Sequence, residues 1–163
     1  MDTKDTNQVG FLLKKIVTDQ FATIESAFIE NEPINIIVGI EYGIREENKI
    51  VGCFTNFQFL IHDIPFIIIK VSCEFGIEES SWNNYIDDEK NVILFPLDFI
   101  RHLVLLTIGT ARGVLHAKTE NTRYNQYFLP TINLTELVKE DISFTLDTKP
   151  ERVILSKSKR IKK

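Results

Sequence analysis

The residues of this sequence with the most versatile chemistry are three histidines and two cysteines: His62, His102, His116, Cys53 and Cys73. Such side chains bind zinc or act in nucleophilic catalysis when several lie together. His102 lies four residues after Asp98, one turn further along a helix, so the two side chains are placed to pair. A structural or surface pair is favoured over a metal site because no third ligand clusters with them. We therefore expect no metal site.

The two cysteines lie in segments that the pattern below places on neighbouring strands, facing each other. A redox or metal role is one interpretation, but two buried free thiols that act as small apolar side chains are favoured. His62-Asp63 occupies a predicted hairpin tip with no nucleophile nearby. The sequence also lacks the glycine-rich loops that bind nucleotides. We expect no cofactor and no enzymatic activity.

One long segment, Val92–Gly113, predicts the main helix. Pro96 fits the first helical turn and Asp98 suits the positive helix N-terminus. The helix is expected to end between Thr107 and Thr119. Its apolar residues form two faces: Leu97, Ile100, Val104, Ile108, Ala111 and Leu115 on one, Phe99, Leu103 and Leu106 on the other. Both faces require cover. A sheet covers one, and a loop, a second subunit or a ligand is needed for the other.

Alternation of apolar and polar residues predicts antiparallel strands with one buried face. A bent strand with a break near Asp19 or Gln20 comes first, and three regular strands follow: Phe11–Phe28, Ile34–Arg45, Ile50–Ile61 and Phe66–Ile77. A two-residue turn at Glu47-Asn48 pairs Ile44 with Val51 and Tyr42 with Cys53. A turn centred on Asp63 pairs Ile61 with Pro65 and Cys53 with Cys73. Both registers keep the apolar sets on one face.

The remaining segments complete the predicted fold. Residues 78–91 form a polar linker, Asn133 caps a short helix over 134–138, and a short strand begins at Ile142. The fold class is α+β, with a four-stranded antiparallel sheet packed against a long helix plus a short second helix. We expect a disordered segment at 1–10, a single domain over 11–147 and a basic flexible tail at 148–163.

Composition and charge narrow the function. With 44% hydrophobic and 26% charged residues, the chain is globular. The net charge is −4, but the last twelve residues contain six bases and no acid, so the rest carries −10. An acidic body argues against nucleic-acid binding. No apolar run is long enough to cross a membrane, and no signal peptide is evident, so we expect a cytoplasmic protein without membrane insertion.

Two short motifs resemble a known family. Ile93-Leu94-Phe95-Pro96 opens the long helix, and the segment Leu129–Leu134, LPTINL, precedes the short one. With the preceding strands, this order resembles the bacterial export chaperone SecB and its relatives. The resemblance covers most of residues 11–138, although its specific motifs amount to about ten residues.

The resemblance implies a chaperone without a nucleotide site. SecB-like proteins form tetramers as dimers of dimers and hold unfolded polypeptides in apolar grooves. Typical members deliver precursors to the translocase motor SecA, and some relatives guard antitoxins. This chain departs from the family in its long polar loop Lys118–Tyr127, its aromatic linker and its extension Ile142–Lys163. The acidic strand surface offered to SecA has only Glu41 and Glu74 as its nearest counterparts, which puts SecA delivery in doubt.

Three hypotheses remain open. The first is a homo-oligomeric holdase, dimer or tetramer, for unfolded polypeptides. The second is an oligomeric adaptor for one partner, such as an antitoxin or a phage protein. The third is a small-molecule-binding protein or enzyme. Core or subunit-interface packing is at least as good an interpretation of the apolar residues that we assign to client binding: Phe54, Leu60, Trp82, Tyr85, Tyr127, Phe128 and Leu129.

Overall fold

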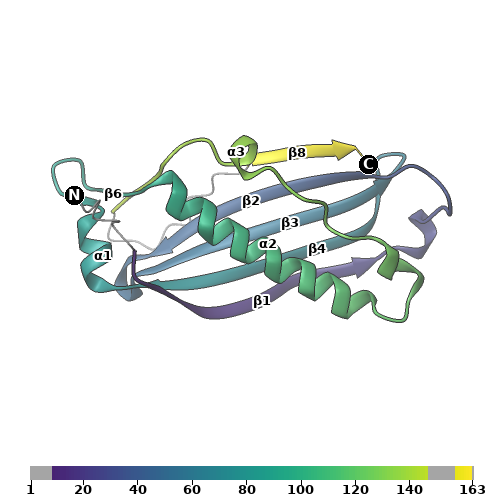
Figure 1. Cartoon of the computed structure of the whole chain (residues 1–163), viewed down its shortest axis with the longest axis horizontal. Helices are drawn as coiled ribbons and strands as arrows, with labels where there is room; N and C mark the ends of the chain where they lie inside the picture. The colour runs from purple at the N-terminus through teal and green to yellow at the C-terminus, as the bar shows by residue number, and fades with distance from the viewer. Residues whose placement is uncertain (1–8, 147–156, 163) are drawn as a thin grey trace, which may run out of the picture.

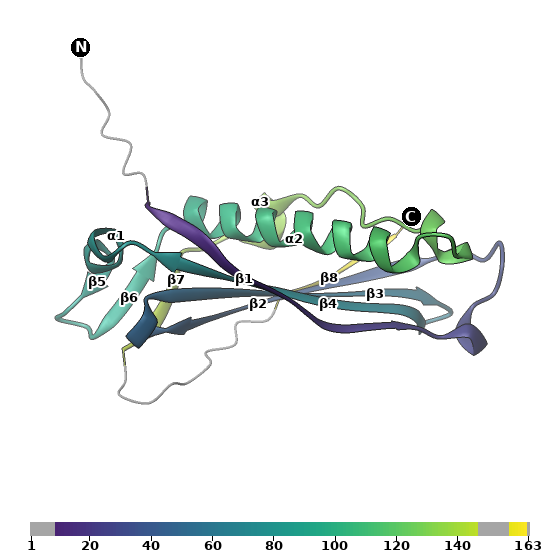
Figure 2. The same ribbon diagram turned by 90° about the horizontal axis from the view of Figure 1, so that it is seen from below.

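A computed structural model describes residues 9–146 and the backbone of residues 157–162. Most of the chain folds into an antiparallel sheet with a long helix across one face (Figures 1 and 2). The predicted α+β architecture is confirmed. The sheet has the strand order β1-β4-β3-β2-β8. Its strands are β1 (Phe11–Thr23), β2 (Asn35–Arg45), β3 (Ile50–Ile61), β4 (Ile64–Ile77) and β8 (Lys157–Lys162).

The first strand is shorter than predicted. β1 ends at Thr23, and a 3-10 turn, η1 (Glu25–Ala27), follows it. Its pairing with β4 shifts register between Thr18 and Gln20, which confirms the predicted break, and also between Leu13 and Lys15. Such shifts arise where an extra residue bulges from one strand. β1 therefore bends around the sheet rather than running straight beside β4.

The two hairpins keep the predicted core registers but differ at their turns. Four residues, including η2 (Glu46–Asn48), connect β2 to β3, whereas a two-residue turn was predicted. At the next hairpin Ile61 pairs with Ile64, so the predicted pairing with Pro65 is wrong. His62 and Asp63 both have positive φ, of 50° and 64°, which makes a tight two-residue turn. A register shift after Phe59 then restores the predicted alignment.

The polar linker is structured. It contains α1 (Glu79–Asn84) and β5 (Ile86–Asp87). β5 pairs with β6 (Val92–Phe95), which pairs with β7 (Ile142–Thr145) in a second, three-stranded sheet at one end of the molecule. The short strand predicted from Ile142 is therefore confirmed, and it completes this small sheet.

The long helix α2 (Leu97–Thr119) begins directly after Pro96 and packs on β3 and β4. The chain then turns through η3 (Arg123–Gln126) and runs back beside α2 to the short helix α3 (Leu134–Leu137) (Figure 1). As predicted, Asn133 caps α3, its side chain accepting a hydrogen bond from the Thr135 amide at 3.1 Å. We call residues 127–138 the strap.

The ends of the predicted domain need correction. Gly10 is not disordered: its amide donates to Ser81 Oγ at 3.1 Å, and its carbonyl accepts from Glu78. Residues 157–162 do not form a flexible tail but pair with β2 as β8. Residues 1–8, 148–156 and 163, which were also assigned to the two ends, lie outside the described residues. The flexible tail was predicted from its basic composition, but an edge strand pairs through its main chain and need not bury its side chains.

The core lies between the sheet and α2. The buried side chains come from one face of each central strand and from the facing side of the helix: Ile36, Val38, Ile40, Val51, Cys53, Phe57, Ile67, Ile69, Val71, Phe75, Ile100, Val104, Ile108 and Ala111. In the described part of the chain, no helix combines the length and apolarity needed to cross a bilayer.

Candidate functional site

The residues predicted to bind clients are scattered, and several are buried. Trp82 packs edge-on against Phe95 with ring centroids 5.7 Å apart, and is buried. Leu60 and Leu129 are also buried. These three side chains belong to the core of this chain and are not accessible to a client. They were assigned to client binding because they are apolar, but an apolar residue type does not distinguish a core position from an exposed one.

The other four predicted residues lie in three separate places. Tyr85 stacks near Phe99 at the α1 end of the molecule. Tyr127 packs on Phe66 at the opposite end, with ring centroids 5.1 Å apart, and burial raises its pKa. Phe128, which follows it in the strap, is 57% exposed. The fourth residue, Phe54, lies on the face of the sheet away from α2. No single surface brings the predicted set together.

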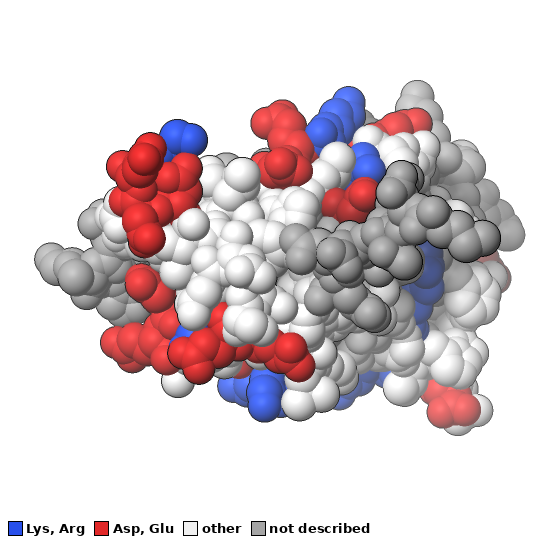
Figure 3. All heavy atoms as spheres, turned by 60° about the vertical axis from the view of Figure 1, so that its left-hand side comes forward, with Lys and Arg blue, Asp and Glu red and all other residues white. Residues whose placement is uncertain are grey.

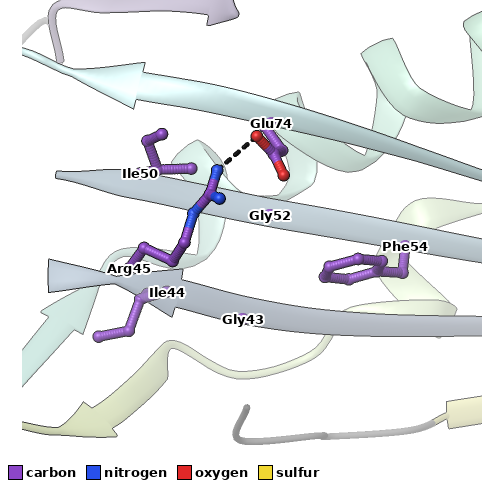
Figure 4. Close-up of a pocket in the computed structure, with 7 residues that line it drawn as sticks. All are labelled: Gly43, Ile44, Arg45, Ile50, Gly52, Phe54 and Glu74. Carbon is purple, nitrogen blue, oxygen red and sulfur yellow. Dashed lines mark hydrogen bonds and ion pairs between the residues drawn. The ribbon is translucent and has the colours of Figure 1, made fainter. Parts of the chain in front are cut away.

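A small pocket surrounds Phe54 (Figure 4). Its floor includes the directly paired glycines Gly43 and Gly52, and the Phe54 ring lies over Gly52, where an added Cβ would come within 2.9 Å of the ring. Arg45 donates to Glu74 at 2.5 Å on one side. The volume is about 90 Å³, well below the roughly 300 Å³ of a small-molecule site. The pocket has room for one side chain of a partner.

An accessible apolar surface lies on the other face, between β1 and α2. Leu13 and Ile16 of β1 pair with Phe75 and Cys73 of β4, so they lie on the face that carries the helix. They are nevertheless 43% and 50% exposed. Strand β1 is the outermost strand on this side of the sheet. Its outer main-chain groups have no strand partner among the described residues.

The helix contributes the other half of this surface. The Phe11 ring packs edge-on against Phe99 and His102, with centroids 5.7 and 5.5 Å apart. Leu106 follows His102 by one helical turn on the same side of α2 and is 40% exposed. Leu105 is 52% exposed but follows Arg101 by one helical turn, so it lies on the side of α2 that faces the strap. We define the β1–α2 surface as Leu13, Ile16 and Leu106. β1 and α2 both start from the α1 end of the molecule (Figures 1 and 2).

The sequence predicted the helix half of this surface in part. It required cover for a second apolar face of α2 that includes Leu106, and the structure covers Phe99 and Leu103 but leaves Leu106 exposed. The exposure of Leu13 and Ile16 was not predicted, because the bulge between Leu13 and Lys15 that brings both side chains to the helix face leaves no mark in the alternation. Only the position of β1 at the edge of the sheet leaves them accessible.

The predicted chemistry of the histidines needs one correction. Asp98 pairs with Arg101 at 3.6 Å rather than with His102, whose ring packs on Phe11. His62 lies 3.1 Å from Glu32, and His116 lies 3.1 Å from Asn125. Among the described residues no group of His, Cys, Asp or Glu is arranged to hold a metal ion.

The two cysteines face each other across β3 and β4, as predicted, and both are free and buried. Burial raises the pKa of the Cys53 thiol to about 12, an effect to which neighbouring Cys73 adds and which a hydrogen bond with Thr107 opposes. A thiol in this state is a poor nucleophile because the thiolate is the reactive form. The pair therefore packs as small apolar side chains.

The α1 end of the molecule differs from the β1–α2 surface in its charge. Acidic groups gather at that end, where α1 and the β5–β6 loop lie (Figure 3). Two lysines neutralise part of this charge: Lys90 pairs with Asp87 at 3.0 Å and Lys49 with Glu79 at 3.2 Å. The hydrogen bonds from Lys90 lower the pKa of Asp87. This end is therefore a poor site for apolar segments, which favours the β1–α2 surface.

Neither the family models nor the curated proteins nor the solved structures gave a match to this chain. The function therefore has to be argued from the chain's own surfaces.

Proposed function

We propose that this protein is a SecB-like chaperone that holds non-native polypeptides on the β1–α2 surface, without a cofactor or catalysis. The observation that carries the proposal is the exposure of Leu13, Ile16 and Leu106 beside an open strand edge. Exposed apolar surface of this kind commonly marks a binding site. The sequence resemblance to SecB-like proteins supports the same function.

The two parts of the surface suit an unfolded client in different ways. The open edge of β1 offers main-chain N–H and C=O groups that any extended polypeptide can pair with. The leucine and isoleucine side chains bury client apolar groups without demanding a particular shape, since the gain comes from released water. Neither interaction depends on the sequence of the client. Promiscuous binding is the expected result.

Association of copies fits the same surface. A long open edge with apolar neighbours is a liability in a monomer, and proteins manage it by covering or pairing it. We propose a homo-oligomer, a dimer or a tetramer, in which copies share this surface with clients. SecA is proposed as a partner on the sequence resemblance alone. Of the two acids nearest to the family's SecA surface, Glu74 is already paired with Arg45.

The pocket at Phe54 favours a second candidate, an adaptor for one defined partner such as an antitoxin or a phage protein. Its glycine floor allows close approach of a partner backbone, and its volume fits one inserted side chain. The third hypothesis, an enzyme or small-molecule binder, gains no support from a pocket of this size.

The holdase proposal is tested by suppression of aggregation of a heat-unfolded reporter enzyme, followed by light scattering. Ile16→Glu and Leu106→Glu place a charge on the surface, and each should weaken client binding at least about tenfold, about 1.4 kcal/mol. Matched controls are Ile64→Glu and Leu94→Glu, which change equally exposed residues elsewhere. Equal protection by all four variants would show that the surface does not bind clients. A single tight ligand that docks at Phe54 would select the adaptor.

A further inference from the structure

The opposite edge of the sheet is occupied by the chain's own last described strand. β8 pairs antiparallel with the first half of β2, from Asn35–Lys162 to Ile40–Lys157 (Figure 1). The second half of β2, Glu41–Arg45, has no partner on that side among the described residues. An extended segment that adds to a free strand edge is a recognised mode of peptide binding. The structure therefore contains both the edge and a bound example of its ligand.

β8 is a peripheral part of the sheet. It pairs over six positions, against eleven for β2 with β3 and twelve for β3 with β4. Residues 146–156 separate it from β7, and main-chain pairing with β2 is the attachment that the described residues show. Short edge elements open locally at lower free energy than the central strands. The strand at this edge is therefore poised for exchange.

Charge defines which segment the edge prefers. The strand Lys157–Lys162 has the sequence KSKRIK, with four basic residues in six. The part of β2 that it pairs with is bounded by Glu32 before it and Glu41 after it. Apart from its last twelve residues, the chain carries a net charge of −10. An extended basic segment is attracted to this edge, and an acidic one is repelled.

We propose that the Asn35–Ile40 edge of β2 is an exchangeable strand-binding site, and that two copies of this chain swap their 157–162 strands there. The swapped strand makes the same main-chain pairs as the internal one, so exchange costs little beyond association. Ten residues lie between Leu146 and Lys157, and a linker of that length has an extended length of at most about 33 Å. This inference does not depend on the proposed chaperone function.

A labelled peptide of residues 155–163 tests the site. Added to the chain shortened after Ser156, it should bind with a micromolar Kd by fluorescence anisotropy, and at least tenfold more weakly to the full chain, whose edge is occupied. A Lys159→Pro peptide keeps three of its four strand bases but lacks an N–H that points to β2 in the register Val38–Lys159, so it should not bind. Equal binding of the two peptides, or no binding to the shortened chain, overturns the site.

Circular dichroism checks whether the chain shortened after Ser156 is folded. If it fails to fold, the full chain with Lys159→Pro replaces it, because its own strand then lacks a main-chain hydrogen bond to β2. In that variant the amides of Ile36, Val38 and Ile40, which face β8, should exchange faster with solvent, and the peptide should restore their protection. Unchanged exchange, or peptide without effect, also contradicts the proposal.

Exchange between copies is tested with cysteines at one paired position. Asn35 and Lys162 are register partners, and paired antiparallel strands bring such positions within disulfide reach. Full chains that carry Asn35→Cys alone and Lys162→Cys alone are mixed under oxidising conditions. A covalent dimer is expected, and the chain with both substitutions should also close internally. Internal closure without any dimer would show that the strand stays in its own chain and would overturn the swap.

Discussion

Two rows of apolar side chains lie on the same face of the sheet but differ in how far they are buried. On β2, Ile36, Val38 and Ile40 are almost wholly buried. On β1, Leu13 and Ile16 face the same side yet remain about half exposed. The two rows resemble each other in sequence. What differs is the part of the chain that covers them after the sheet has formed.

The strap makes this difference. It runs beside α2 on the β2 side and buries Leu129, Leu137 and Val138 there (Figure 1). Two arginines of α2 hold it: Arg101 Nε donates to the Val138 carbonyl at 3.1 Å, and Arg112 donates to the carbonyl of Pro130 at 2.8 Å. On the β1 side no comparable cover exists among the described residues. Among the described residues, the β2 side of this face is covered and the β1 side is open.

The largest expected effect compares one isoleucine from each row. Ile36→Ala removes a fully buried side chain and should lower the free energy of unfolding by about 2–5 kcal/mol. Ile16→Ala removes a half-exposed one and should cost less than about 1 kcal/mol, since less contact is lost. Urea denaturation of the two variants measures both values. Equal losses would mean that β1 is as well covered as β2.

The next largest expected effect is the loss of stability when the hydrogen bonds that hold the strap are removed. Arg112→Ala deletes the hydrogen bonds to the Leu129 and Pro130 carbonyls and should cost about 1.5–3 kcal/mol. Arg112→Lys keeps the charge but not the forked donor geometry, so its loss should be intermediate. Amide exchange of residues 127–138 should accelerate in the same order. A strap unaffected by either change would show that its apolar side chains alone hold it.

A smaller effect, of opposite sign, concerns the exposed side of α2. Nothing lies within 4 Å of a Cβ built on Gly109, so Gly109→Ala should stabilise the helix by about 1 kcal/mol. Gly52→Ala is the contrast, because its Cβ meets the Phe54 ring and should destabilise the sheet. Thermal unfolding distinguishes the two. If Gly109→Ala instead weakens self-association, that side of α2 is an interface between copies.

The last comparison concerns the reactivity of the Cys53 thiol beneath α2, whose pKa of about 12 compares with an ordinary value of 9.0. Because the pKa is raised in the folded protein, the stability that Cys53 contributes is complete below pH 9 and is lost as the pH rises towards 12. At pH 9 iodoacetamide should modify Cys53 at least about tenfold more slowly in the folded protein than in urea. Rapid modification would show that water enters from the β1 side.

The sequence predicted the elements whose pattern is local. Alternation located the central strands and the facing pair of cysteines, and Pro96 located the start of α2. The His62-Asp63 turn was misplaced by one residue, because a bulge after Phe59 compensates for it without any mark in the apolar pattern.

The candidate surface was much less predictable. Exposure of Leu13 depends on β1 lying at the end of the strand order, which is a property of the whole sheet. Trp82 was assigned to clients because its segment is polar, yet its ring is enclosed by Phe95 and the end of the core. β8 was missed because a basic segment with one isoleucine has no apolar period, and its pairing with β2 is made through the main chain.

The strand order has a consequence for folding of the protein during its translation. β2 is translated long before β8, with residues 46–156 between them. At cellular elongation rates that interval lasts roughly 5–20 seconds. Throughout it, the nascent chain displays a ready-made β edge that its own sequence cannot yet close. Neighbouring nascent chains on the same messenger RNA are then the nearest candidates to close it, so assembly has its first opportunity during translation.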